Sequence, residues 1–203
     1  MKKTLIVRIG EGLGNQLFMY ANAYSLSKKF DYNLYIDDES GFSKKSRSRS
    51  YNLDIFDIPE QVCPEELKFN NSIKNLKRKT FKFIDNFTKN KRFIIEKIDK
   101  NKQSKFDEIS KLESIQIYIE GHYESELYFK DFEIDLKKNL KIKHDLININ
   151  NPYINQIKQT NSVSIHLTKT RYSEDLNNQS ILNNEKDALF EKNLINYVNR
   201  SIK

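Results

Sequence analysis

Cysteine, glycine, proline and tryptophan are scarce in this chain of 203 residues, which has one, five, three and none of them respectively. The single cysteine, Cys63, excludes an internal disulfide and a thiolate metal site, and it fits a reducing compartment. No apolar run approaches the roughly 18 residues of a membrane span. The run at residues 4–9 contains Arg8 and is too short for the core of a secretory signal. We therefore expect a cytoplasmic protein.

The chain has no excess of acidic groups: its net charge is +7, and much of the positive charge lies in residues 43–50 and 74–92. The second basic stretch spaces five apolar residues along one face of a helix: Ile73, Leu76, Phe83, Ile84 and Phe87. Such a helix either lies on an anionic membrane surface, here the inner face of the membrane, or packs its apolar face on the core. We recognise no nucleic-acid-binding module and expect no nucleic-acid partner.

The order of apolar segments predicts an α/β fold with a parallel sheet. The chain is 37% hydrophobic, which is enough to form a core. Short apolar runs predict strands at residues 4–9, 33–37, 93–98 and 115–121, and helical spacing predicts helices at residues 15–30 and 125–140. In the second of these helices we expect five side chains to face inward: Leu127, Tyr128, Phe132, Leu136 and Leu140.

We expect two parts of unequal size. Residues 1–150 form a Rossmann-like N-terminal domain. Residues 151–203 form a connector that Pro152 interrupts, then a strand at residues 162–167 and a final helix. A strand, loop and helix of roughly 40 residues cannot bury a core alone. This second part therefore either completes the first sheet or begins a second domain that is incomplete.

Three of the five glycines fall at residues 10, 12 and 14, between the first strand and the first helix. A dinucleotide-binding fingerprint needs G-x-G-x-x-G and an acidic residue at the end of the second strand. Asp37 or Asp38 supplies the acid, but Asn15 stands where the third glycine belongs. That glycine allows close packing of helix on strand, so its absence argues against a dinucleotide. No G-K-[ST] follows, which excludes a Walker loop.

The two amides at the start of this helix suggest a different ligand. Asn15 and Gln16 can each donate and accept hydrogen bonds, as uncharged sugar hydroxyls require. The glycines at 12 and 14 would bring backbone N–H groups to the same small cleft. The alternative for Asn15 is an ordinary helix cap.

Four stretches resemble glycosyltransferase family 11, the bacterial and animal α-1,2-fucosyltransferases. "GLGNQLFMYA" at residues 12–21 is similar to the opening motif of that family, and "SYNLDIF" at residues 50–56 to its next short segment. The stretch at residues 119–143 resembles the passage that contains G-Y-x-Q-S-x-x-Y-F. "VSIHL" at residues 163–167 resembles the strand that enters the donor motif H-x-R-R-x-D. The matches occur in the family's order along nearly the whole chain.

The resemblance implies a GT-B architecture, in which two Rossmann-like halves face each other across a cleft. It implies transfer of L-fucose from GDP-fucose to a galactoside hydroxyl of a glycan, with inversion and without metal or other cofactor. The N-terminal half would hold the acceptor through Gly12, Gly14, Asn15 and Gln16, with Tyr123 and Glu124 nearby. Glu124 is alternatively a solvated surface acid. The C-terminal half would hold the donor through His166, Lys169 and Arg171, where His166 has the alternative of a structural role.

The donor motif departs from the family at three positions. Thr168 and Lys169 stand at the two arginines, and Arg171 stands at the aspartate. Arginine offers phosphate a planar bidentate fork, whereas threonine offers one hydroxyl. Family members also continue further along the donor half, so we expect weak transferase activity or none. The alternatives are a non-catalytic glycan-binding or partner-subunit protein and, with less support, a nucleotide-dependent oxidoreductase.

Overall fold

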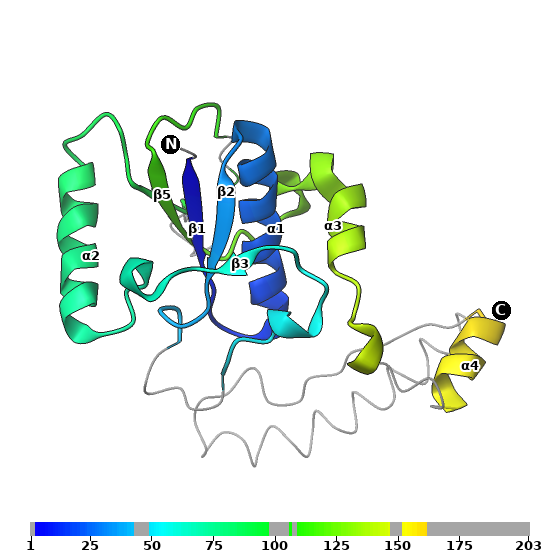
Figure 1. Ribbon diagram of the computed structural model, residues 1–203. Helices are drawn as coiled ribbons and strands as arrows, with labels where there is room; N and C mark the ends of the chain where they lie inside the picture. The colour runs from blue at the N-terminus through cyan, green and yellow to red at the C-terminus, as the bar shows by residue number, and fades with distance from the viewer. Residues whose placement is uncertain (1–2, 43–48, 98–105, 107–108, 147–151, 162–203) are drawn as a thin grey trace, which may run out of the picture. The chain divides into compact units, whose positions relative to one another are not determined.

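The computed structural model describes residues 3–42, 49–97, 106, 109–146 and 152–161 (Figure 1). The chain divides into two compact units, Met1–Asn148 and Ile149–Lys203, and each is described here by itself. In the second unit the described residues contain one helix, α4 (Pro152–Gln159). The predicted strand at residues 162–167 and the donor candidates His166, Lys169 and Arg171 lie outside the described residues.

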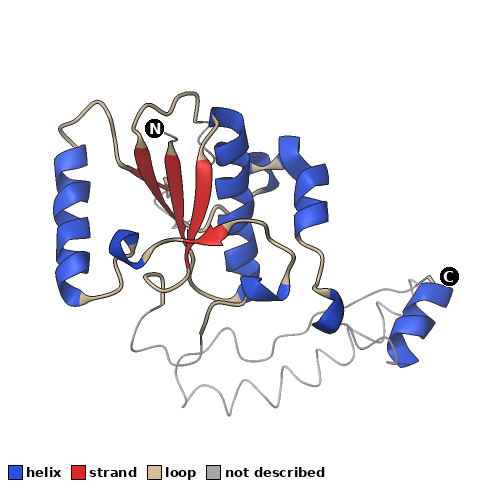
Figure 2. Ribbon diagram, in the orientation of Figure 1, coloured by secondary structure: helices blue, strands red, loops and turns tan. Residues whose placement is uncertain are grey.

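The first unit is built on a five-stranded parallel sheet with the strand order β3-β2-β1-β5-β4 (Figure 2). Its strands are β1 (Thr4–Arg8), β2 (Asn33–Asp37), β3 (Gln61–Val62), β4 (Phe93–Ile95) and β5 (Gln116–Glu120). β1 lies at the centre, where Leu5 pairs with Leu34 on one side and with Ile117 on the other. The predicted α/β, Rossmann-like parallel sheet is confirmed for this unit.

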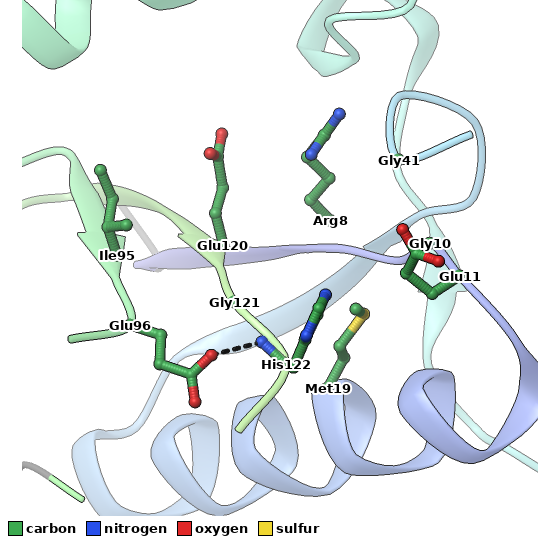
Figure 3. A pocket seen from close by; sticks show the side chains of 10 residues that line it. All are labelled: Arg8, Gly10, Glu11, Met19, Gly41, Ile95, Glu96, Glu120, Gly121 and His122. Atoms are coloured by element: carbon green, nitrogen blue, oxygen red, sulfur yellow. Dashed lines mark hydrogen bonds between the residues drawn. The ribbon is translucent and has the colours of Figure 1, made fainter. Parts of the chain in front are cut away.

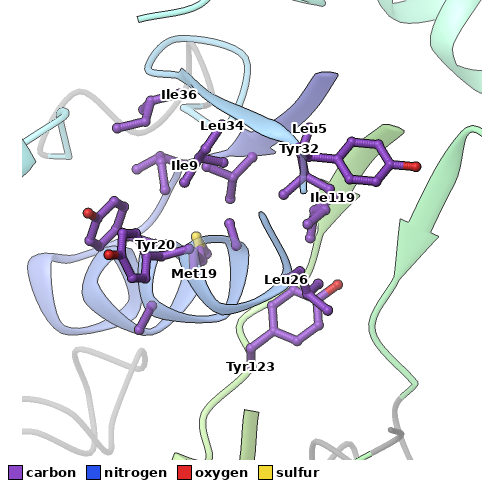
Figure 4. Packing of buried hydrophobic residues seen from close by; sticks show 14 of the residues in the cluster. Leu5, Ile9, Met19, Tyr20, Leu26, Tyr32, Leu34, Ile36, Ile119 and Tyr123 are labelled. Atoms are coloured by element: carbon purple, nitrogen blue, oxygen red, sulfur yellow. The ribbon is translucent and has the colours of Figure 1, made fainter. Parts of the chain in front are cut away.

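Helix α1 (Leu13–Phe30) covers one face of the sheet and joins β1 to β2. Every residue from 19 to 27 is buried, so the helix lies between two layers of protein instead of presenting one apolar face. The sheet covers one side of it, and the segment that carries α3 covers the other (Figure 1). Figure 4 shows Leu5 and Leu34 of the sheet, with Ile9 just after β1, opposite Met19 and Tyr20 of α1.

The prediction of one continuous helix at residues 125–140 is wrong. The structure instead has two 3₁₀ turns and a short helix: Glu126–Tyr128, Lys130–Phe132 and α3 (Glu133–Asn139). The helical backbone is interrupted at Phe129, with φ −141° and ψ 7°, and its ring lies 6.0 Å from that of Phe18. Leu127, in the turn before this break, is 54% exposed, against the prediction. Leu136 is buried as predicted.

Helix α2 (Ser72–Asp85) lies on the other face of the sheet (Figure 1). The core on this face is small and contains four buried residues: Ile6, Cys63, Phe93 and Tyr118. From α2 only Phe81 packs against it among the apolar residues. The interpretation that the apolar face of this basic helix packs on the core is wrong, because Ile73, Leu76 and Phe83 are exposed.

The remaining short elements connect these layers. They are 3₁₀ turns at Leu53–Ile55, Glu65–Leu67 and His144–Leu146. Leu53 is fully buried against α1. Within the part of the chain that the structure describes, every helix is too short or too polar to cross a bilayer.

Candidate functional site

A cavity of about 250 Å³ opens at the carboxyl ends of the central strands (Figure 3). It is lined by residues that follow or end strands β1, β5 and β4, among them Arg8, Gly10, Glu11, Glu96, Glu120 and His122. The chain leaves β1 toward β2 on one side, while β5 lies on the other, so the cavity sits where the strand order reverses. Open α/β sheets bind ligands at this position. Its volume is just below the roughly 300–1,000 Å³ of typical ligand pockets, which suits a single sugar ring or phosphate better than a dinucleotide.

The polar side chains around the cavity lie on both sides of the sheet. Figure 3 shows Arg8 and Glu120 extending to one side, and Glu96 and His122 lying on the other, beside Met19 of α1. Arg8 donates from Nε and Nη2 to the carbonyl oxygen of Ser40, at 3.0 and 2.5 Å. This fork closes the loop after β2 against the end of β1.

Glu120 ends β5 as a buried carboxylate with two cationic partners. Arg78 donates from Nε to Oε1 and from Nη2 to Oε2 at 2.7 Å, and Lys82 donates to Oε2 at 2.9 Å. Burial raises the pKa of the Glu120 carboxyl, but the hydrogen bonds and charges of Arg78 and Lys82 outweigh it and hold the pKa below its ordinary value. Glu120 is therefore an anchor for α2 and a poor proton acceptor.

Glu96 holds the turn after β5 in place. Its Oε2 accepts the backbone N–H of His122 at 2.6 Å, and its Oε1 accepts that of Tyr123 at 2.8 Å. The turn needs this support because Gly121 has φ 154° and Tyr123 has φ 56°, a conformation that costs a bulky residue energy. As a result, the His122 imidazole lines the cavity, half-exposed.

The two residues predicted on the acceptor side lie in different surroundings. Tyr123 belongs to the core cluster, and its hydroxyl donates to the carbonyl oxygen of Glu120 at 3.2 Å. Burial raises the pKa of the Tyr123 phenol well above its ordinary value. Glu124 is exposed, with Oε1 at 3.9 Å from Nδ1 of His122. Of this pair, only Glu124 presents its side chain to solvent beside the cavity.

In the glycine loop after β1, Gly10 lies where the backbone crosses close to that of the loop after β2. A Cβ atom on Gly10 would lie 2.8 Å from the carbonyl oxygen of Gly41, and one on Gly41 would lie 1.7 Å from that of Ile9. The loops after β1 and β2 can therefore touch only through these two glycines. Gly12 and Gly14 have open space around the corresponding positions. They leave the N-terminus of α1 accessible beside the cavity.

Gln16 is fully buried and binds the protein's own backbone. Its Nε2 donates to the carbonyl oxygens of Glu11 at 2.9 Å and Ser50 at 2.8 Å, and its Oε1 accepts the N–H of Asn52 at 2.9 Å. Both amide protons are used, so in this conformation Gln16 has no donor left for a sugar hydroxyl. The interpretation of Asn15 as the helix cap is wrong, because α1 begins at Leu13 and Gly12 is its N-cap. Asn15 lies half-buried in the first turn.

The two acidic residues at the end of β2, Asp37 and Asp38, both contact other groups of the protein. Asp37 is fully buried, where its Oδ1 accepts the N–H groups of Glu39 and Ser40 and its Oδ2 accepts the hydroxyl of Tyr118. Asp38 pairs with the buried Lys68 at 2.8 Å. The Asp37 carboxylate is therefore closed to a ribose hydroxyl, which argues against a dinucleotide held by that residue. In the described ranges, no group of three or more His, Cys, Asp or Glu side chains could hold a metal ion.

Comparison of the chain with protein-family models, with curated proteins and with solved structures finds no match. Its function must therefore be inferred from the sequence motifs and from the cavity itself.

Arg8, Glu96, Glu120 and His122 line the cavity but were not among the predicted site residues. One general signal could have found two of them. Arg8 and Glu120 are the last residues of β1 and β5, and the carboxyl ends of central parallel strands form the ligand-binding edge. Glu96 and His122 carry no such signal, because their contact depends on the conformation of the turn after β5.

A methyl group added at Gly41 is expected to destabilise the fold, whereas the same change at Gly14 is not. In Gly41→Ala the new Cβ meets backbone atoms that cannot rotate away, and overpacking of this kind costs about 1–3 kcal/mol. In Gly14→Ala it meets open space on a helix, where alanine is favoured by up to about 1 kcal/mol. Urea unfolding followed by circular dichroism measures both. Equal effects of the two substitutions would contradict the close crossing of the loops.

Proposed function

We propose that this chain is a fucosyltransferase-like protein, related in function to the α-1,2-fucosyltransferases that its motifs resemble. The reaction is transfer of L-fucose from GDP-fucose to a galactoside hydroxyl of a glycan, with inversion. In this proposal the Rossmann-like unit receives the acceptor at the cavity beyond β1 and β5. The donor is held by the second unit, through His166, Lys169 and Arg171.

The observation that carries this proposal is the packing of the motif segments on one another. Gln16 of the first stretch binds the backbone of Ser50 and Asn52 of the second. In the third stretch, Asn139 donates to the hydroxyl of Tyr20 at 3.2 Å. Ile142 of the same stretch forms an antiparallel bridge with Phe56. Segments more than a hundred residues apart thus form one structural unit, which supports a shared origin for the matches.

The cavity offers groups suited to an uncharged acceptor. His122 can accept a proton from a hydroxyl group, and Glu11, whose carboxylate pairs with Arg49, lies in the same wall. In an inverting transfer the acceptor oxygen loses its proton and bonds to the anomeric carbon of fucose. The bond from that carbon to the diphosphate breaks, and GDP leaves with added negative charge. We assign proton acceptance to His122 and stabilisation of the diphosphate to Lys169 and Arg171.

A second candidate is a glycan-binding protein or partner subunit without catalysis. It is favoured by Thr168, which stands where the donor motif has an arginine. Such a protein would bind a galactoside in the cavity and would not bind GDP-fucose. An oxidoreductase has less support, because Asp37 is buried and hydrogen-bonded within the protein and the cavity is small.

Calorimetric titration of the full chain tests these proposals. We expect saturable binding of GDP-fucose and of lactose as a simple galactoside, with no binding of GDP-mannose or NADH. His122→Ala should weaken lactose binding at least about five-fold, since it removes one hydrogen-bonding partner. His144→Ala, at an exposed histidine of the same unit, is the matched control.

Binding of lactose alone would favour the non-catalytic protein over the transferase. Binding of NADH alone would overturn both. Equal lactose affinity of the two histidine variants would contradict an acceptor site in the cavity, whether or not GDP-fucose binds.

A further inference from the structure

Helix α2 presents an apolar stripe to solvent. The α2 stripe consists of Ile73, Leu76, Phe83 and Ile84 of the helix and Phe87 just beyond its end. Their exposed fractions run from 46% at Ile84 to 83% at Ile73. The rings of Phe83 and Phe87 form an edge-to-face pair with centroids 5.4 Å apart. Surface helices normally turn such a stripe toward the core, so its outward direction needs a physical cause.

The cause is the opposite face of the helix, which is held to the body of the protein by polar contacts. Arg78 and Lys82 bind the buried carboxylate of Glu120. At the C-terminal end of the helix, Oδ2 of Asp85 accepts the backbone N–H groups of Arg92 and Phe93, at 2.7 and 2.8 Å. Because these contacts fix the rotation of α2 about its axis, the stripe cannot turn inward without breaking them.

Positive charge borders the α2 stripe on both sides. At 100° per residue, Lys77 lies at one edge of the stripe and Lys79 at the other, and both are exposed. The one acidic residue of α2, Asp85, is buried on the opposite face. Beyond the helix, the exposed Lys89 and Lys91 extend the positive charge past Phe87. Lysines at the border of an apolar face can extend their ammonium groups to anionic headgroups while the stems cover apolar surface.

We propose that the α2 stripe docks this protein on an anionic phospholipid surface. The apolar side chains enter the boundary between headgroups and acyl chains, and the bordering lysines contact lipid phosphates and carboxylates. A helix of 14 residues is about 21 Å long and about 10 Å wide. Its footprint of about 200 Å² is far below the roughly 800 Å² per partner of a stable protein interface. A second copy packed stripe to stripe would also bring like charges together at both borders.

The absence of tryptophan from the chain allows a direct measurement. Phe87→Trp places a single fluorophore in the α2 stripe. We expect its emission to shift to the blue on titration with vesicles of phosphatidylcholine containing about 30% phosphatidylserine, and to shift less with phosphatidylcholine alone. Ile134→Trp is the matched control, because Ile134 is 73% exposed on α3 and lies outside the stripe. Its emission should not change.

Vesicle co-sedimentation of further variants then separates the apolar contribution to membrane binding from the electrostatic contribution. Phe83→Ser with Phe87→Ser should reduce partitioning by about ten-fold or more per phenylalanine. Lys77→Gln with Lys79→Gln should reduce binding to the anionic vesicles by about thirty-fold in total and should weaken its dependence on salt. Ile134→Ser should leave binding unchanged. Far-UV circular dichroism of each variant should match the parent, because all these side chains are exposed.

Three results would overturn the assignment of this surface to lipid. One is vesicle binding that survives the double serine variant. Another is emission from Phe87→Trp that is already blue-shifted without vesicles, which would mean that another part of the chain covers the stripe. The third is absence of vesicle binding with a concentration-dependent dimer, seen by sedimentation velocity, that the double serine variant disperses.

Discussion

Replacing Arg78 with methionine is expected to lower the free energy of unfolding by about 3–5 kcal/mol. The Glu120 carboxylate is 7% exposed, and Arg78 is the one partner that contacts both of its oxygens among the residues described. Methionine preserves most of the packing but leaves a buried charge with Lys82 alone. Loss of one member of a buried ion pair costs far more than loss of a surface pair. Urea unfolding at about pH 7 measures the effect.

The matched control is Lys79→Met, on the next residue of the same helix. Lys79 is exposed, so we expect a change within about 0.5 kcal/mol. The difference in the free energy of unfolding between Arg78→Met and the parent should become smaller in acid. The folded-state pKa of Glu120 is depressed, so its contribution is present above the ordinary value of 4.5 and is lost as the pH falls through the folded-state pKa. Equal losses from both substitutions, or a difference independent of pH, would contradict the anchoring role of Arg78.

Under the proposed function, replacing Thr168 with arginine is expected to raise fucosyl transfer about 10²–10³-fold. The leaving GDP gains negative charge as the sugar–phosphate bond breaks, and the proposed reaction has no metal to balance it. A threonine hydroxyl at that place offers one neutral hydrogen bond, whereas arginine offers a charged fork. The measurement is transfer of radiolabelled fucose from GDP-fucose to lactose by the parent and by Thr168→Arg.

Thr170→Arg is the control for this prediction. It adds the same charge two residues away, at a motif position with no fixed residue. Activation by Thr168→Arg alone would support the proposed alignment of the donor motif on His166. Equal activity of the two variants would show that the resemblance at residues 163–167 does not extend to the chemistry of the donor site.

The central strands and α1 could be predicted because local sequence determines them. The run at residues 4–9 is apolar and ends at Gly10, and β1 occupies Thr4–Arg8. β2 has the bounds that its pattern predicts. The predicted strand at 93–98 is shorter in the structure, since β4 ends at Ile95. In each case the burial of a short apolar run on a parallel sheet explains the success.

The orientation of α2 could not be predicted, because periodicity defines an apolar face without saying which way it turns. The direction of that face depends on the contact between Arg78 and Glu120. These residues are 42 positions apart, so the local sequence of the helix does not reveal the contact. The break at Phe129 has a similar origin, since its ring packs against Phe18 of a distant helix. Long-range contacts overrode the local pattern at both places.

The sequence pattern pointed to the glycine turn after β1, and the structure has a cavity beside that turn with a different set of side chains in its wall. The amide of Gln16 is chemically suited to a sugar, yet the backbone of Ser50 and Asn52 uses it. No pattern within residues 10–16 reveals that partner, because it lies more than thirty residues further along the chain. His122 reaches the cavity only through the turn that Glu96 holds.

β1 waits longer than any other strand of the described sheet for its second neighbour while the protein is being made. β1 can pair with β2 as soon as Asn33–Asp37 has emerged, but its other partner is Gln116–Glu120. At translation rates of about 5–20 residues per second, the interval is on the order of 5–20 s. Throughout it, the apolar residues 5–7 have one unpaired edge, of the kind that recruits other chains. Ribosome-bound chains that stop before β5 should therefore be targets for chaperones and prone to aggregate.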